Sequence, residues 1–491
     1  MQPIISGHGR VRADFRFRWL RFATLSLLSL TCLDRAGAAT LTDDQQQWLH
    51  TAHRRNQHGW IFVHVEGEAR ARGFQHGYLL AREIAESIRA HRAIWENESA
   101  LPWSWLVDRT RTLIEPRVDA ETRDELDGLA EGLQAAGVTS SRTELVADNA
   151  FFELAWYWWP KEKEAMQGVS IPPPKQSCSA FIATGHLTAD GGVVLGHNSM
   201  VDYPEATANV IMDIKPARGQ RILWQTWPGW LHSGTDFFVT GAGLVGAETT
   251  LGAFEGYDTN GIPEFVRMRR ATQDATSIDE WCAIMRQGNN GGYANAWLLG
   301  DVRSGEIARL ELGLRHVGFE RKRDGCFLGS NITEDRRILR FETKANENDI
   351  RISNVARRER WKQLMAQNAG RIDRAHARQF ESDHFDVLVG RGQPGSRTLC
   401  GHVELDRDPQ GAWPGAPYYP CGTFDGKVVD TTMARRMSFE ARWGAACGRP
   451  FDAPAFLAAH PQYEWMRDVL RSRPTQPWTT FQAEPAATVA R

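Results

Sequence analysis

Several motifs that mark common hydrolases and metal enzymes are missing from this chain. It contains no GxSxG, which argues against the serine elbow of an α/β-hydrolase. It has no HExxH, no CxxC and no Cys/His spacing of the zinc type, so we expect no metal, and no organic cofactor is needed. His384 in "ESDHFD" could ligate a metal, but an exposed acidic turn is the favoured interpretation. "GRGQPG" at 390–395 satisfies GxGxxG formally, yet it contains a proline and lacks a strand–turn–helix around it, which indicates a loop.

The chain also lacks a strong net charge and, beyond residue 39, any hydrophobic run of membrane-spanning length. Its formal net charge of -2 gives no reason to expect a nucleic-acid partner. Residues 1–39 combine a basic stretch, the short apolar run "ATLSLLSLTCL" and the small residues "AGAA". This layout predicts a secretory signal cleaved near Ala38 or Ala39, with an uncleaved anchor as the alternative. We expect an exported, soluble protein that is secreted or periplasmic, or lies in a lysosome-like lumen if the source is eukaryotic.

Cysteine is sparse, with seven residues in the whole chain, of which Cys32 lies in the predicted signal. In an oxidising compartment the remaining six suggest three disulfides. If Cys178 stays a free thiol, at least one more cysteine is also unpaired. Cys400 and Cys421 flank a Pro/Gly-rich loop and are the preferred disulfide pair.

The predicted secondary structure changes at Cys178, from mainly helical before it to mainly strands after it. Residues 40–177 show helical patterns at 42–55, 74–95, 121–137 and 141–159, one strand at 59–68, and a Pro-rich loop that ends at Ser177. Residues 178–491 contain short alternating or apolar runs split by Gly, Asp and Asn, with helical patterns at 263–287 and 353–367. These patterns predict an α+β protein with layered, mainly antiparallel sheets, and no internal repeats.

Cys178 stands in "KQSCSAF", between the Pro-rich loop and a predicted strand. A structural cysteine usually packs inside an element, whereas this position suits a nucleophile exposed by cutting the chain before it. Cleavage of the Ser177–Cys178 bond would place an α-amine, with a pKa of roughly 8, beside the thiol. One residue would then supply both nucleophile and base. A buried structural or disulfide cysteine is the alternative.

A series of motifs downstream and upstream of Cys178 resembles a known family. "CSAFIA", "GHNSM", "GLVGAETTLG", "NNGGYANAWLLGD" and "GTFDGKVVDTTMARRMSF" occur in that order, after "VEGEARARGFQHGYLLA" and "DNAFFELAWYW". The succession resembles the phospholipase B-like family of N-terminal nucleophile hydrolases, from about residue 60 to about residue 450. "GFQHG" and "DHFDVLVGRGQPGSRTLCGHVE" are also similar to penicillin acyltransferase-type enzymes and acid amidases. The resemblance implies an αββα sandwich of two mostly antiparallel sheets and self-cleavage before Cys178. The apolar character of the predicted strand at 59–68 suggests that the N-terminal segment stays in the fold after the cut, as a non-covalent or disulfide-linked chain.

The resemblance also implies catalytic partners for Cys178. His197 in "GHN" would orient the thiolate or bind the substrate head group, with a strand-end histidine as the alternative. Thr249 in "AETT" would donate to the tetrahedral intermediate, unless it is an ordinary strand threonine. Asn295 in "YANAW" matches an oxyanion-hole asparagine, although only one of the family's two adjacent asparagines is present.

Four further residues are implied as substrate-binding groups. Asn198 would hold His197 or the substrate, and Glu248 would line the pocket beside Thr249. Asn331 and Arg397 are weaker candidates for pocket polarity.

The resemblance implies an acyl hydrolase that removes fatty acyl groups from phospholipids through an acyl-thioester on Cys178. An N-acyl amide hydrolase or acyltransferase, a non-catalytic lipid-binding protein of the same fold, and a structural disulfide protein remain alternatives. The 19 tryptophans include clusters at 155–160 and 224–230, which core packing explains for the most part but which agree with an acyl-chain substrate. The expected partner is a lipid or N-acyl small molecule, with transient membrane-surface contact and no nucleic acid.

Overall fold

The computed structural model describes residues 41–168, 178–205, 210–409 and 416–485. Residues Ala39–Arg491 form one compact unit. The predicted signal at 1–39 and the cleavage residue Ser177 lie outside the described residues, whereas Cys178 is described. Within those ranges, no helix is both long enough and apolar enough to cross a membrane.

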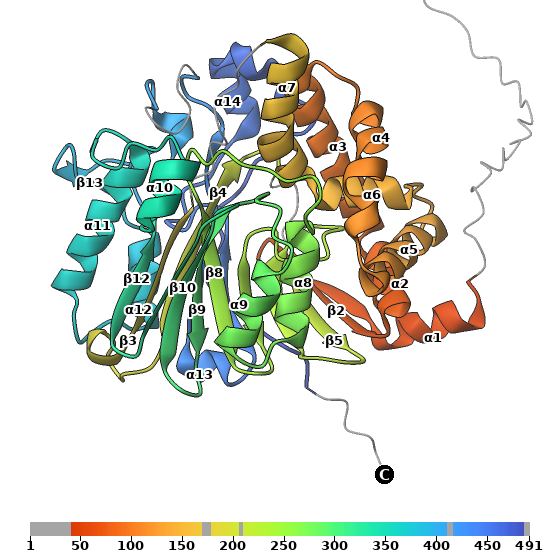
Figure 1. Cartoon of the computed structure of the whole chain (residues 1–491), viewed down its shortest axis with the longest axis horizontal. Helices are drawn as coiled ribbons and strands as arrows, with labels where there is room; N and C mark the ends of the chain where they lie inside the picture. The colour runs from red at the N-terminus through yellow and green to blue at the C-terminus, as the bar shows by residue number, and fades with distance from the viewer. Residues whose placement is uncertain (1–40, 169–177, 206–209, 410–415, 486–491) are drawn as a thin grey trace, which may run out of the picture. The chain divides into compact units, whose positions relative to one another are not determined.

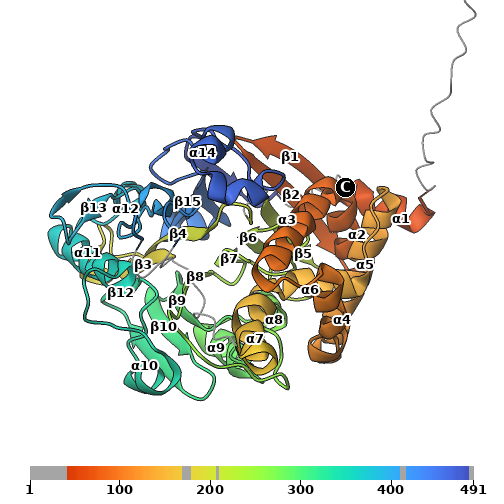
Figure 2. The same cartoon turned by 90° about the horizontal axis from the view of Figure 1, so that it is seen from above.

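Two large sheets carry the strands (Figures 1 and 2). The first has nine strands in the order β1 (His53–Gln57), β2 (Trp60–Gly67), β5 (Val210–Pro216), β6 (Ile222–Thr226), β7 (Phe237–Thr240), β8 (Leu244–Thr250), β9 (Asn295–Asp301), β10 (Glu306–Leu312) and β11 (Val317–Lys322). The second has six strands in the order β12 (Gly325–Gly329), β3 (Ser179–Thr184), β4 (Val194–Asp202), β15 (Cys421–Asp430), β16 (Ser438–Trp443) and β17 (Thr479–Gln482). A short hairpin joins β13 (Phe385–Asp386) to β14 (Arg391–Gly392).

Residue alternation along the strands explains how the two sheets pack. On β3, Ala180 and Ile182 belong to the large core that contains the side chains of β8 and β9. Phe181 and Ala183, which point the opposite way, pack with helix residues of a second core. The sheets come close enough at Gly300 that an added Cβ would lie 3.1 Å from Ile182 Cδ1. The inner faces of the two sheets therefore pack directly against each other.

Helices cover both outer faces. The nine-stranded sheet is covered by α8 (Glu264–Asp274) and α9 (Ile278–Arg286), and the six-stranded sheet by α11 (Ser353–Gln367) and α12 (Arg374–Glu381) (Figure 2). This is the αββα sandwich that the sequence predicted. Shorter helices α10 (Arg336–Glu342), α13 (Thr431–Ala434) and α14 (Ala453–Ala459) lie in the connections.

The segment before Cys178 is mainly helical, as predicted. It contains α1 (Asp43–Thr51), α2 (Ala69–Leu79), α3 (Ala81–Ser99), α4 (Trp103–Leu113), α5 (Ala120–Ala135), α6 (Arg142–Asn149), a π-helical turn (Glu153–Trp158) and α7 (Trp159–Gln167). Helices α2 and α5 touch through glycines, since a Cβ on Gly73 would lie 1.9 Å from Glu125 O. The same segment supplies β1 and β2, and β2 pairs in parallel with β5. Residues before Cys178 are thus part of the nine-stranded sheet.

The predicted Cys400–Cys421 disulfide is wrong. All six cysteines in the described part of the chain are free thiols. Cys421 begins β15 and packs with Val403, whereas Cys400 packs with Ala446 and Cys447. The two cysteines flank one loop in sequence, but they belong to different hydrophobic clusters.

Candidate functional site

Cys178 lies at the start of β3, as its position in the sequence indicated. The register pairs Ser179 with Asn198 and Ala180 with His197. Because side chains alternate along a strand, Cys178 shares the inner face with Ala180. Its side chain is buried, and the backbone amide of Met200 faces the thiol. Burial and the nearby carboxyl groups of Glu248 and Asp236 raise the pKa of the Cys178 thiol, so the thiol of the uncut chain is protonated at neutral pH.

A buried arginine that the sequence analysis missed holds the backbone of Cys178. Arg357 of α11 is fully buried and donates through Nη1 to the carbonyl oxygen of Cys178 at 2.5 Å and to Ser179 Oγ at 3.1 Å. Its Nη2 donates to Asn331 Oδ1 at 2.9 Å. Burial lowers the pKa of Arg357 to about 10, which leaves the guanidinium charged at neutral pH. Nothing in "SNVARRERW" distinguishes this arginine from its neighbours.

His197 lies on the inner face of β4, opposite Lys427 of β15. It is fully buried and stacks on Phe237 with ring centroids 6.5 Å apart. Neither ring nitrogen has a hydrogen-bond partner among the described residues, although the ring faces the backbone of Glu248. Burial and the charge of Lys427 lower the pKa of His197 well below its ordinary value, so the imidazole is neutral.

Lys427 forms a buried ion pair beside His197. Its Nζ donates to Asp425 Oδ1 at 2.7 Å and to Ser199 Oγ at 2.6 Å. Both charged side chains are fully buried. A buried pair of this kind stabilises little by itself, and it places a fixed positive charge near the thiol.

A pair of buried carboxyl groups adjoins the thiol. Tyr293 Oη lies 3.0 Å from Asp236 Oδ2 and 3.1 Å from Glu248 Oε1. The orientation of Asn295 that satisfies its hydrogen bonds donates from the amide nitrogen to Glu248 Oε2 at 2.7 Å. Burial raises the pKa of Glu248 to about 8 and raises the pKa of Asp236 well above its ordinary value. The pair therefore retains a proton at neutral pH.

Thr249 points toward the six-stranded sheet, away from Glu248. An added Cβ on Gly329 of β12 would lie 2.6 Å from Thr249 Cγ2, so the sheets approach closely here. The Thr249 hydroxyl is buried, and no group in the described ranges accepts from it or donates to it. Since buried hydroxyls are normally paired, the hydroxyl is free to bind another group.

The N-terminal helices position the loop that carries Asp236. His76 Nε2 accepts from Gly229 N at 3.0 Å, and Asn149 Oδ1 accepts from Leu231 N at 2.8 Å. Asp148 Oδ2 accepts from the Trp230 indole at 2.9 Å. The motifs "GFQHG" and "DNAFF" thus act by holding this loop. Trp224, Trp227 and Trp230 are fully buried, so core packing explains this tryptophan cluster.

Three predicted site residues serve other contacts. Asn198 points to the helical side of β4, where its amide donates to Glu381 O at 2.6 Å and to Leu399 O at 3.0 Å. Asn331 binds Arg357 and donates to Thr250 O at 2.8 Å, so it supports the Cys178 clamp. Arg397 pairs with Asp386 at 2.7 Å beside the β13–β14 hairpin.

The structure therefore places Cys178, His197 and Thr249 on the facing inner sides of the two sheets. It pairs Asn295 with Glu248, whose side chain points away from Thr249. Four residues that were not singled out also belong to the site. Lys427 and Tyr293 lie in motifs that carry the family resemblance, and Asp236 lies shortly before "GLVGAETTLG", so the resemblance is the signal that could have found them. Arg357 has no such signal. The contribution of each to catalysis stays a prediction.

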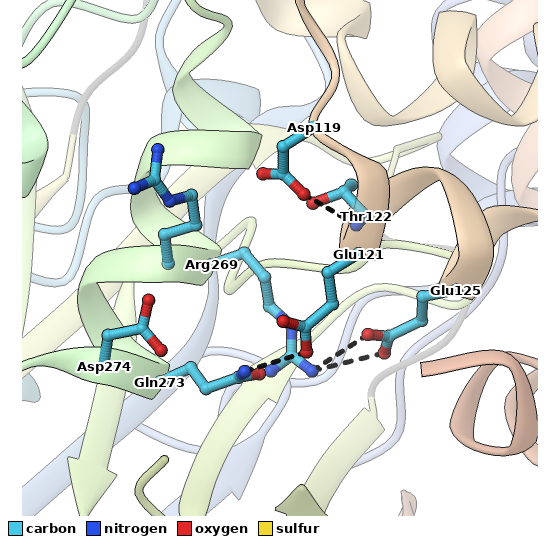
Figure 3. Close-up of a pocket in the computed structure, with 8 residues that line it drawn as sticks. Asp119, Glu121, Thr122, Glu125, Arg269, Gln273 and Asp274 are labelled. Atoms are coloured by element: carbon cyan, nitrogen blue, oxygen red, sulfur yellow. Dashed lines mark hydrogen bonds and ion pairs between the residues drawn. The ribbon is translucent and has the colours of Figure 1, made fainter. Parts of the chain in front are cut away.

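Two other groups of polar residues lie elsewhere in the structure. Between α5 and α8, charged side chains line a small cavity of about 60 Å³ (Figure 3). Figure 3 shows Glu125 hydrogen-bonded to Arg269, and Glu121 to Gln273, so these groups already satisfy one another. The second group, which could hold a metal ion, comprises His384, Cys400, His402 and Cys447.

Comparison with known proteins agrees with the motifs around Cys178. A profile of the phospholipase B family matches residues 127–309, which include Cys178, His197 and Asn295. The similarity is to the phospholipase B family. The resemblance seen in the sequence is thereby confirmed.

Individual relatives match over shorter stretches. "Putative phospholipase B-like 2" of Rattus norvegicus is 28% identical over 149 residues, which are 26% of this chain and 24% of the relative. The Bos taurus protein of the same name is 33% identical over 94 residues, 18% of this chain and 16% of the relative. This chain thus spans less than a quarter of the length of these curated relatives. A solved structure of a mutant conjugated bile acid hydrolase from Clostridium perfringens aligns over 54% of this chain and 89% of its own, with 11% identity and a TM-score of 0.34.

Proposed function

We propose that this chain is an exported acyl hydrolase, activated by cleavage of the Ser177–Cys178 bond, that uses the thiol of N-terminal Cys178 as its nucleophile. The observation that carries the proposal is the setting of Cys178. It stands directly before an inner strand, its carbonyl is held by Arg357, and the buried charged groups of Glu248, Asp236 and Lys427 act on its thiol. The similarity to the phospholipase B family and the signal-like layout of residues 1–39 support the reaction class and the export.

Activation requires no external nucleophile except water. The Cys178 sulfur attacks the carbonyl carbon of Ser177, the peptide C–N bond breaks, and the nitrogen takes the thiol proton as it becomes a free amine. Water then hydrolyses the thioester, which releases the Ser177 carboxylate and restores the thiol. Because the pKa of the buried thiol is raised, the uncut chain is a poor nucleophile toward outside substrates.

In the cut chain, the α-amine of Cys178 is the general base. Arg357 holds the adjoining carbonyl and keeps the terminal residue in place. Its positive charge disfavours the ammonium form of the amine, so the amine is available to accept the thiol proton. The substrate acyl group then forms a thioester on Cys178, and water releases it. The Thr249 hydroxyl is the proposed donor for the oxyanion, because it has no partner among the described residues whereas the Asn295 amide already donates to Glu248.

The proposed substrate is a phospholipid that loses a fatty acyl group. The names of the relatives support this class. The amide alternative remains because a thiol with an α-amine base can also attack an amide carbonyl. Turnover of phosphatidylcholine vesicles against an N-acyl amino acid separates the two.

One observation favours a second candidate, a lipid-binding protein without catalysis. Asn295 lacks the second asparagine of the family motif, and its amide is bound to Glu248. This candidate predicts that the chain stays uncut, or that a cut chain does not react with acyl electrophiles.

The test is N-terminal sequencing and intact mass of the purified protein. We expect two chains in the wild type, one beginning Cys-Ser-Ala-Phe, and a single chain in Cys178→Ala. Cys282→Ser, a buried cysteine on α9, is the matched control and should be cut normally. An uncut wild-type chain with an inert Cys178 would rule out the nucleophile and leave the lipid-binding protein.

A further inference from the structure

Four side chains that can ligate a metal converge on the helical side of the six-stranded sheet. They come from three segments that are far apart in the sequence. His384 follows α12, Cys400 and His402 precede β15, and Cys447 follows β16. One ligand atom from each residue lies within 4.8 Å of all the others. No local sequence pattern marks this group, because its members are separated by 16 residues or more, apart from Cys400 and His402.

The distances between these atoms match the edges of a tetrahedral zinc site. His402 Nε2 lies 3.6 Å from Cys400 Sγ and 3.5 Å from Cys447 Sγ. With Zn–S of about 2.3 Å and Zn–N of about 2.0–2.1 Å, tetrahedral geometry requires S···N edges of about 3.5 Å. Both measured edges agree with this value, so the placement of His402 Nε2 relative to the two sulfurs is that of a tetrahedral zinc site.

The surroundings orient the ligands as a metal site requires. His402 Nδ1 lies 2.9 Å from Glu404 Oε1, which directs Nε2 toward the two sulfurs. His384 Nε2 is buried and has no hydrogen-bond partner within the described ranges. A carboxylate that fixes the orientation of a histidine, and a buried histidine nitrogen that is free to accept a ligand bond, are both features that a metal site requires.

The backbone around the ligands is firmly held. Cys400 N donates to Asp383 O at 3.0 Å, and Gly401 N donates to Thr423 Oγ1 at 2.9 Å. Asn198 of β4 binds the carbonyl of Leu399, the residue before Cys400. These contacts connect the cluster to the strand that carries His197, the neighbour of Asn198.

We propose that His384, Cys400, His402 and Cys447 bind one zinc ion in a closed, structural Cys₂His₂ site. Four protein ligands leave no position for a substrate or an activated water, which makes this a structural site and not a catalytic one. The ion ties the end of α12, the loop before β15 and the end of β16 together. Since β15 carries Lys427 and Asp425 and pairs with β4, the site supports the part of the sheet next to the strand that carries His197.

Metal analysis of the full-length wild-type chain, purified without a histidine tag, tests the proposal. We expect one zinc per chain by mass spectrometry of the metal, retained in Cys326→Ser and lost in Cys447→Ser. Cys326 is the matched control because it is a half-buried free thiol on β12. Chelation of the wild-type protein should lower its Tm by more than about 5 °C, and zinc should restore it.

Cobalt(II) keeps the test decisive if Cys447→Ser does not fold. Added to the chelated wild-type chain, it should give the visible bands of a tetrahedral site and thiolate charge-transfer absorption, both weakened in His384→Ala. A Cys400–Cys447 disulfide in the wild-type protein, or free thiols with no metal after growth in zinc-supplemented medium, would overturn the proposal.

Discussion

Replacing Arg357 by lysine tests whether this buried arginine positions the nucleophile. Lysine keeps the positive charge but has three donors on one nitrogen, whereas the guanidinium is a planar fork with five. In the structure the guanidinium meets five acceptors within 3.1 Å, namely Cys178 O, Ser179 Oγ, Asn331 Oδ1, Ser353 Oγ and Asn354 Oδ1. A lysine can serve at most three, so at least two buried acceptors lose their partner.

The expected cost follows from these contacts. Each buried acceptor left without a partner costs about 1–3 kcal/mol, so Arg357→Lys should lower the free energy of unfolding by about 2–6 kcal/mol. For a folded unit of about 450 residues, the unfolding entropy is roughly 0.9 kcal/mol/K, which converts this loss to a Tm decrease of about 2–7 °C. Cleavage before Cys178 should slow by at least about tenfold, since the scissile bond and the thiol are no longer held in one geometry.

The assay is differential scanning calorimetry together with the half-time of chain cleavage. Arg358→Lys is the matched control, because Arg358 is the next residue of the same helix and its side chain is 16% exposed, with contacts to Glu359 and Glu347. The control should behave like the wild type. If Arg357→Lys kept both the wild-type Tm and the wild-type cleavage rate, the clamp on Cys178 would have no role in activation.

Three further substitutions test the remaining parts of the site. Thr249→Val removes a buried hydroxyl that has no partner in the described part of the chain, so it should raise the free energy of unfolding by about 1 kcal/mol. It also removes the proposed oxyanion donor and should lower kcat/KM by at least about tenfold. Unchanged kcat/KM would exclude Thr249 as a donor. Glu248 has a folded-state pKa of about 8, above its unfolded value of 4.5, so its contribution to stability is present below pH 4.5 and is lost as pH rises toward 8. The decrease in Tm from pH 5 to pH 8 should therefore be smaller in Glu248→Gln than in the wild type. An equal decrease in the two proteins would contradict this pKa shift. Arg397→Gln should leave kcat/KM within about twofold of the wild-type value, because the Arg397 side chain is occupied by its ion pair with Asp386. A tenfold loss would indicate that Arg397 binds the substrate.

Local pattern in the sequence sufficed for most elements and for the position of Cys178 at the start of a strand. The alternating runs after residue 178 predicted most of the strands. The helical spacing before it predicted most of the N-terminal helices, with 74–95 divided into α2 and α3 at Leu80. Helix α4 was not predicted, and residues 53–55, which were expected to be helical, begin β1. Cys178 was identified because a proline-rich loop and a strand meet there. These are properties of neighbouring residues, and alternation along one strand also fixes which residues share a face.

What the tertiary structure decided is which residues from distant segments meet. The parallel pairing of β2 with β5, the clamp from Arg357 to Cys178, and the bond from Asn295 to Glu248 all depend on strand register and helix placement. Asn198 directly follows His197 on β4, so its side chain points away from the thiol, which strand placement decides. The group of His384, Cys400, His402 and Cys447 also depends on tertiary structure, because its members come from three separate connections. The sequence by itself determined the elements and the cysteine at their boundary. The neighbours of that cysteine were decided by long-range packing, because a shift of one residue in register moves every side chain to the other face of its sheet.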